Sequence, residues 1–298
     1  MGRWYPGADR YHAAMDAGGL PSLGGLERAV SLAGLGPGAP TAVRARLEWS
    51  ARLGYRQVQL DAAARDARPR DLSRSARRDL AAALRRLELR ASGVDLWIPP
   101  RHLVQPETAD RALSALADAA RFAAEMADLT GGTPVLSTAL PAGEARERAV
   151  SSVEGAVAAS GARLADHAWP PDPAAVESGR SGGVLAVGLD PAAVFLASGD
   201  ADERGKGGGD GGEGGRWGGP GRSASRLGAA LLAARLSDLA PEGRVAPGEG
   251  RLDATAYVVS LATAGYGGPL VVDLRGLRDP EAGARRGLDA GSIGPPIA

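Results

Sequence analysis

Near the C-terminus, two short apolar segments flank a polar loop and an amphipathic segment, an order that is compatible with few folds. Residues 231–236 and 270–274 have the length and apolar content of buried strands, and residues 254–264 have helical spacing. Asp253 stands directly before the helix, where we expect its side chain to cap the first turn. A strand, a helix and a second strand in this order indicate a parallel β/α unit.

The same alternation extends over most of the chain. Helical spacing is clearest over residues 110–129, where Leu113, Leu116 and Ala120 share one face. Eight strands, each followed by a helix or its remnant, predict an α/β fold that closes into a (β/α)8 TIM barrel, with an open doubly wound sheet as the alternative. The strand-like segments are residues 29–32, 58–60, 89–96, 134–138, 162–165, 184–189, 231–236 and 270–274.

Composition predicts one domain with less ordered segments around and within it. Residues 1–26 have no clear periodicity and are expected to be an N-terminal extension. Residues 27–280 are expected to form a single barrel domain, followed by a loose C-terminal tail over residues 281–298. Residues 201–225 are expected to be a disordered insertion, because this glycine-rich stretch has too few side chains to offset the entropy of ordering.

Charge and cysteine content exclude several classes of function. The 298 residues include 35 basic and 35 acidic ones, so no electrostatic argument favours nucleic acid or an anionic membrane as a partner. The chain has no cysteine, which excludes disulfides, thiolate nucleophiles and zinc–cysteine sites. No apolar run reaches the roughly 18 residues of a membrane span, and no apolar signal core is present, so a cytoplasmic protein is expected.

Three motifs in the last two β/α units resemble a known family. The motifs are Arg235-Leu236-Ser237-Asp238 at the end of one strand, Gly248-Glu249-Gly250 in the following loop, and Asp273 at the end of the final strand. They are similar to the last units of the xylose isomerase-like sugar phosphate isomerases and epimerases. In that family a strand ending in His-x-x-Asp precedes a Gly-Glu-Gly loop, and the final strand ends in a carboxylate. Arg235 stands where the family has a metal-binding histidine.

The resemblance implies isomerisation or epimerisation of a small sugar or polyol through an enediolate. In the family, a divalent metal (Mn, Mg, Co or Zn) polarises the carbonyl of the substrate, and two carboxylates move a proton between adjacent carbons. A barrel holds such a site at the C-terminal ends of its strands. Dimers are common in the family, so a homodimer is also an expectation.

Position by position, the resemblance assigns roles to seven residues. The expected metal ligands are Asp190, Asp273, Asp166 and His167, the last two being alternatives for one position; the expected proton carriers are Asp166 and Asp273; and the expected substrate contacts are Arg235, Arg244 and Glu249. Other polar residues at predicted strand ends are Asp61, Asp95, His102 and Asp238.

Arginine in place of the histidine supports a second interpretation. A guanidinium group stays protonated and is not a metal ligand, but it can replace the charge of the metal by pairing with Asp190 and Asp273. Three residues after Asp190, where the family often has a substrate-binding histidine, the chain has Ala193. These departures predict a barrel without metal or catalysis that acts as a binding or scaffold protein. Endonuclease chemistry, which some relatives perform, is not expected from a chain with 3 histidines.

Structural roles are a further alternative for the same residues. Asp190 precedes a proline and is suited to start a turn or cap a helix. Asp273 has Arg275 and Arg278 nearby as ion-pair partners. Glu249 stands between two glycines and is also suited to shape its loop.

Overall fold

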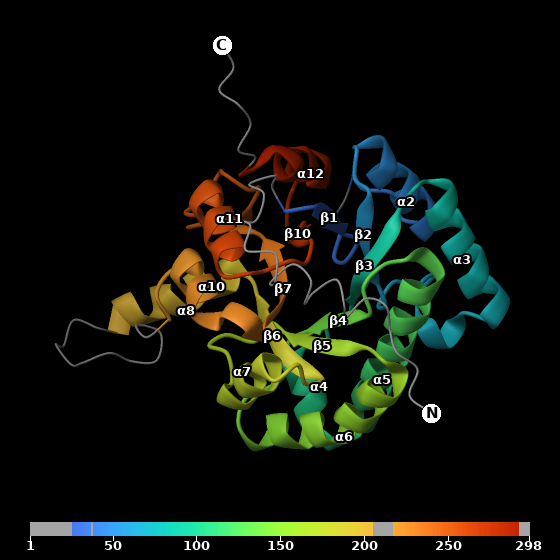
Figure 1. Cartoon of the computed structure of the whole chain (residues 1–298), viewed down its shortest axis with the longest axis horizontal. Coiled ribbons are helices and arrows are strands. Elements are labelled where there is room, and N and C mark those ends of the chain that lie inside the picture. Colours follow the sequence, from blue (N-terminus) through green and yellow to red (C-terminus); the bar gives the residue numbers. More distant parts are fainter. Residues whose placement is uncertain (1–25, 37, 205–216, 292–298) are drawn as a thin grey trace, which may run out of the picture.

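A closed ring of parallel strands forms the centre of the molecule (Figure 1). The structure is a computed structural model that describes residues 26–36, 38–204 and 217–291. Within these residues, eight strands pair in the order β1-β10-β7-β6-β5-β4-β3-β2 and return to β1. The predicted (β/α)8 barrel is therefore confirmed, and the open sheet is wrong. The strands are β1 (Arg28–Ser31), β2 (Gln57–Asp61), β3 (Arg90–Asp95), β4 (Val135–Thr138), β5 (Arg163–Asp166), β6 (Leu185–Leu189), β7 (Leu231–Leu236) and β10 (Leu270–Val272).

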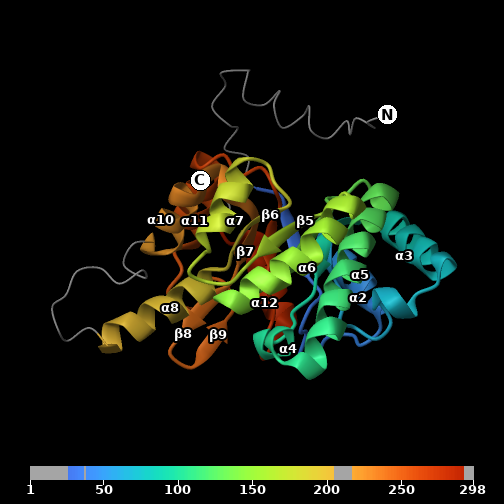
Figure 2. The ribbon, with the colours of Figure 1, turned by 90° about the horizontal axis from the view of Figure 1, so that it is seen from below.

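Helices lie around the outside of the strand ring (Figure 1 and Figure 2). They cover the outer faces of the strands with small and branched apolar side chains, as the scarcity of phenylalanine requires. The longest in the described part of the chain is α5, whose buried residues include Leu116, Phe122 and Met126. The helices are α2 (Val43–Arg52), α3 (Arg74–Arg86), α4 (Pro100–Val104), α5 (Pro106–Thr130), α6 (Glu144–Ser160), α7 (Pro173–Arg180), α8 (Pro191–Arg204), α10 (Pro220–Leu227), α11 (Ala254–Thr263) and α12 (Pro280–Asp289), with 3-10 turns η1 (Pro69–Asp71) and η2 (Gly228–Ala230).

Local sequence sets where several helices begin and end. The carboxylate of Asp253 accepts a hydrogen bond from the backbone N–H of Ala256 at 2.9 Å, so the predicted cap of α11 is confirmed. Ser73 caps α3 in the same way. Helix α5 ends at Gly131, whose φ of 68° lies in the left-handed region that favours glycine.

Three short elements lie between the predicted strands and helices. The short helices α4 and α7 both begin with proline, which is favourable in the first helical turn because its missing N–H has no partner there in any case. The polar loop after β7 contains an antiparallel hairpin of β8 (Asp238–Ala240) and β9 (Gly243–Val245). All three elements are too short to show a periodic pattern.

Parts of the segments that were expected to be less ordered have regular structure among the described residues. The expected N-terminal extension lies outside the described residues except for Leu26, as does the central part of the insertion, residues 205–216. The chain is described again from Trp217, whose ring makes an edge contact with Trp169 at 5.7 Å between centroids. Helix α12 extends into the expected tail, and Tyr55 donates a hydrogen bond to the Ala284 carbonyl at 2.7 Å. None of the helices in the described residues has the length and hydropathy needed to cross a membrane.

Candidate functional site

A buried arginine lies at the C-terminal end of β7. The side chain of Arg235 is fully buried and forms an ion pair with Asp95 at the end of β3. Its Nη1 lies 3.6 Å from Oδ2 of Asp273, which directly follows β10. Strand β3 is not a neighbour of β7 in the ring, so the pair with Asp95 crosses the barrel interior.

Asp190, directly after β6, is paired with two other arginines. Its Oδ2 accepts hydrogen bonds from Nη2 of Arg244 at 2.5 Å and from Nη2 of Arg275 at 3.1 Å. The hydroxyl of Ser237 donates to its Oδ1. Burial on its own raises the pKa of Asp190, but the charges of Arg244 and Arg275 outweigh burial and hold the pKa below its ordinary value.

Asp273 is the carboxylate with the most arginine contacts in the described residues. Arg275 Nε donates to its two oxygens at 2.9 and 3.0 Å, and Nη1 of Arg244 lies 3.3 Å from Oδ2. Burial opposes ionisation here too, but Arg275, Arg235 and Arg244 together hold the pKa of Asp273 well below the usual range. Asp273 is therefore an ionised carboxylate across the physiological pH range.

These six residues form what we call the arginine–aspartate cluster: Asp95, Asp190, Asp273, Arg235, Arg244 and Arg275. Its three carboxylates and three guanidinium groups balance in charge. The indole ring of Trp97 is in contact with the cluster, with the guanidinium carbon of Arg275 at 3.7 Å and that of Arg235 at 4.7 Å from the ring centroid. The C-terminal ends of β3, β6, β7 and β10 are thus joined by paired charges.

Several solved structures have a similar arrangement of strands and helices. A xylose isomerase domain protein from Alicyclobacillus acidocaldarius subsp. acidocaldarius matches with a TM-score of 0.61 and 17% identity, over 88% of this chain and 95% of that one. The D-psicose 3-epimerase of Clostridium cellulolyticum H10, solved with D-tagatose, matches with a TM-score of 0.60 and 15% identity, over 89% and 97%. The fold is xylose isomerase-like. The family resemblance deduced from the sequence is supported at the level of the fold.

A third solved structure with a similar fold contains a bound metal ion. The IOLI protein, solved with a zinc atom, matches with a TM-score of 0.56 and 14% identity, over 89% of this chain and 95% of that one. No protein-family model and no curated protein matches this sequence. At these identities the likeness extends to the fold alone.

In this xylose isomerase-like barrel, the residues present do not fit a divalent cation. Among the described residues, no group of three or more histidine and carboxylate side chains is placed to hold a metal ion. The sequence resemblance aligns Arg235 with the family's histidine ligand, and a guanidinium group has no lone pair to offer a metal. The oxygens of Asp190 and Asp273 already accept hydrogen bonds from Arg244 and Arg275.

The other residues predicted for the site lie at different places. Asp166 forms a buried ion pair with Arg146 of α6 and accepts a hydrogen bond from the N–H of Leu140 at 2.9 Å. Glu249 lies at the surface, 3.1 Å from Arg286 of α12. Asp238 accepts hydrogen bonds from three backbone N–H groups of the loop that contains Glu249, so it holds that loop in place. Of the seven assigned residues, the cluster brings together Asp190, Arg235, Arg244 and Asp273.

His167 is buried beside the cluster without belonging to it. Its Nε2 lies 3.3 Å from the Ser137 hydroxyl, and its ring makes an edge contact with Trp97 at 5.4 Å. Burial, reinforced by the charge of Arg235, holds the pKa of His167 well below its ordinary value, so the ring is neutral.

Gly188 of β6 leaves the space that the His167 ring occupies. A Cβ atom at position 188 would lie 2.4 Å from Cδ2 and Nε2 of that ring. We expect Gly188→Ala to lower the free energy of unfolding by about 1–3 kcal/mol, because the ring and its packing have to shift. Urea denaturation followed by circular dichroism measures this. The control is Gly155→Ala on α6, where an added Cβ meets nothing within 4 Å; equal destabilisation by both variants would contradict the expectation.

Asp61, at the end of β2, has a pKa near neutrality. Burial and the neighbouring Asp95 raise the pKa of Asp61 to about 6, although the N–H of Ala63 donates to Oδ1 at 2.9 Å. A carboxyl with a raised pKa in the fold destabilises the fold as the pH rises through that value, since the unfolded chain ionises at lower cost. Asp61 is thus a source of pH dependence separate from the cluster.

Asp61→Asn is expected to stabilise the protein at pH 8 by about 1–3 kcal/mol, because asparagine keeps the acceptor oxygen and removes the charge. The gain should shrink as the pH falls through about 6 towards 4, where the wild-type carboxyl becomes protonated in the fold. Urea denaturation of both proteins at pH 8, 6 and 4 measures the difference. A gain that does not change with pH would contradict the assigned titration.

Proposed function

We propose that this protein acts by binding, as a non-catalytic xylose isomerase-like barrel in which guanidinium groups stand in place of the catalytic metal. The main observation in support is that Asp190 and Asp273 both pair with Arg244 and Arg275. Arg235, which the sequence resemblance aligns with the family's histidine ligand, is buried beside them. Removing those arginines from the carboxylates would leave buried charges unpaired, at a cost of several kcal/mol. The cluster thus favours its own internal pairing over a cation.

The predicted proton carriers are also poorly suited to catalysis. A general base works best when its pKa lies near the operating pH. The arginine charges hold the pKa of Asp273 far below that value, which makes it a weak base. Asp166 is engaged with Arg146 and with the backbone N–H groups of Leu140 and Ala168. The likeness in fold to sugar epimerases still makes small sugars and polyols the first ligands to test.

Metal titration tests the proposal directly. We expect the wild-type protein to retain none of Mn²⁺, Mg²⁺, Co²⁺ or Zn²⁺ after incubation and desalting. Arg235→His alone should gain little affinity, because Arg244 and Arg275 still neutralise the carboxylates. Combining Arg235→His with Arg244→Met and Arg275→Met should create Mn²⁺ binding in an isothermal titration, provided that circular dichroism shows the variant to be folded. About one retained ion per wild-type chain would refute the proposal.

An activity measurement independent of the product complements the titration. An enediolate mechanism exchanges a carbon-bound proton of the sugar with solvent, so deuterium from D₂O would enter a ketose substrate. We expect no deuterium uptake by fructose, tagatose or psicose with the wild-type protein and added metal. Uptake above a protein-free control would support the isomerase or epimerase alternative.

A further inference from the structure

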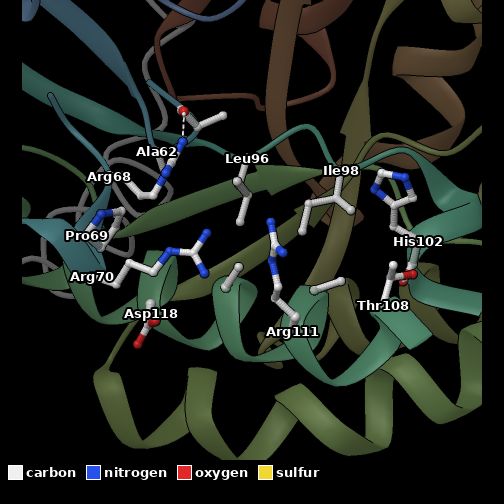
Figure 3. Close-up of a pocket in the computed structure, with 13 residues that line it drawn as sticks. Ala62, Arg68, Pro69, Arg70, Leu96, Ile98, His102, Thr108, Arg111 and Asp118 are labelled. Carbon is white, nitrogen blue, oxygen red and sulfur yellow. Dashed lines mark hydrogen bonds between the residues drawn. The ribbon is translucent and has the colours of Figure 1, made fainter. Parts of the chain in front are cut away.

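A cavity of about 260 Å³ lies between α5 and the segments that follow β2 and β3 (Figure 3). It is enclosed by the turn that follows β2, the segment that follows β3, and the N-terminal half of α5. Ala62 and Leu96, which directly follow these two strands, both line it. The cavity therefore opens near the C-terminal ends of the strands, and no residue of the cluster lines it.

The lining combines apolar and cationic groups. Leu96, Ile98 and Ala112 supply apolar surface, and Arg68, Arg70 and Arg111 supply three guanidinium groups. This combination suits a ligand that has an anionic group on a small apolar body.

Two of the three guanidinium groups are free to bind a ligand. Figure 3 shows Arg70 and Arg111 reaching from opposite sides into the space below Leu96. Within the described residues, neither the Arg70 nor the Arg111 side chain has a hydrogen-bond or ion-pair partner. Arg68, in contrast, donates to the Ala63 carbonyl and pairs with Asp71, both at 3.3 Å.

Asp118, the one acidic residue among those lining the cavity in the described structure, does not neutralise these two arginines. Its carboxylate accepts a hydrogen bond from Arg121 at 2.6 Å, so its charge is already paired. The positive charge of the cavity is therefore not balanced from within.

The cavity walls are held together by a specific bridge. Arg70 belongs to η1, whose Pro69 is buried. Arg77 of α3 donates to the Pro69 carbonyl at 2.6 Å and pairs with Glu125 of α5 at 2.9 Å. This bridge fixes the turn that carries Arg70 relative to the helix that carries Arg111, so the walls of the cavity are in place before a ligand arrives.

We propose that this cavity binds a small phosphate monoester. Two guanidinium groups match the charge of a dianionic phosphoryl group, and each offers paired N–H donors to its oxygens. The ester's carbon body would lie against Leu96 and Ile98. The volume of about 260 Å³ is slightly below the roughly 300–1,000 Å³ of pockets for drug-sized ligands, which fits a small molecule. The site is separate from the cluster, so the proposal holds or fails independently of the metal question.

Isothermal titration of the full chain with phenyl phosphate tests the proposal, at low ionic strength because salt weakens exposed charge pairs. We expect phenyl phosphate to bind about tenfold more tightly than inorganic phosphate, because only the ester uses the apolar surface. Phenol, which lacks the anionic group, should bind at least tenfold more weakly than phenyl phosphate. Equal affinity for inorganic phosphate and phenyl phosphate, or no binding of either, would overturn the assignment.

Matched arginine variants separate this site from general attraction of anions. Arg70→Gln and Arg111→Gln should each weaken phenyl phosphate binding at least tenfold. Both side chains are exposed, so neither change should affect folding. Arg101→Gln is the control, since it removes the same charge from an exposed position in nearby α4 that does not line the cavity. Equal weakening by all three variants would mean that phosphate is attracted only by the overall field.

Discussion

Replacing Arg235 with methionine is expected to lower the free energy of unfolding by about 3–5 kcal/mol at pH 7, because the change leaves Asp95 as an unpaired charge in the interior. Both side chains are essentially inaccessible to solvent, so water cannot replace the lost partner. Methionine keeps much of the length of arginine, which limits the contribution of a cavity. Chemical denaturation followed by circular dichroism measures the change in midpoint and slope.

The pH dependence of this effect has a defined sign. Burial raises the pKa of Asp95, and the charge of Arg235 opposes that rise. Without Arg235 the pKa of Asp95 in the fold rises further above its unfolded value, so stability is lost as the pH increases. The deficit of Arg235→Met should therefore be larger at pH 8 than at pH 5.

Two comparisons identify the cause of this deficit. Adding Asp95→Asn to Arg235→Met should recover most of the lost stability, because asparagine removes the unpaired charge. Arg90→Met breaks a surface pair with Glu27, at 3.2 Å, and should cost less than about 1 kcal/mol. A double variant as unstable as Arg235→Met alone would mean that lost packing, and not the charge on Asp95, causes the effect.

The positions of the cluster residues along the strands are predictable from the sequence. Apolar segments of strand length that end in a polar residue identify Asp190, Arg235 and Asp273 as strand-end residues of a parallel barrel. The structure places all three in the cluster, as closure of the ring requires. A buried position for Arg235 also follows, since it stands inside an apolar strand.

The pairing between these residues is much harder to predict. The sequence predicted that Arg235 would pair with Asp190 and Asp273. The pair with Asp273 is present at 3.6 Å, but the shortest contact of Arg235 is with Asp95, and Arg244 and Arg275 neutralise Asp190. The partners across a barrel depend on strand register and on the side that each side chain faces. Neither is encoded in the local pattern of a single strand.

Two other residues illustrate the same limit. Asp166 stands at a strand end, yet Arg146 of α6, twenty residues earlier, pairs with it. Trp97 gave no signal as a site residue, although its ring contacts two arginines of the cluster. An aromatic residue two positions beyond a strand-end aspartate is the pattern that would have drawn attention to it.

Asp273→Asn is the second change with a large expected effect, a loss of about 3–5 kcal/mol at pH 7. Asp273 is buried and contacts the buried Arg235 and the partly exposed Arg244 and Arg275, so its loss leaves three guanidinium groups with two carboxylates. Because the arginines hold the pKa of Asp273 below its unfolded value, its stabilisation is fully present above about pH 5 and is lost as the pH falls into the acid range. The difference in stability between wild type and variant should therefore shrink on acidification.

Urea denaturation between pH 7 and pH 3 measures this difference, with Asp253→Asn as the control. Asn caps a helix about as well as Asp, so the control should change stability by less than about 0.5 kcal/mol. The same Asp273→Asn protein distinguishes a structural carboxylate from a catalytic one. A proton carrier exposed to substrate is dispensable for folding, so unchanged stability with loss of deuterium exchange into sugars would assign Asp273 to catalysis. A charge-balanced binding barrel requires two results together. Asp273→Asn should lose much stability in a pH-dependent way, and the wild-type protein should show no deuterium exchange into sugars.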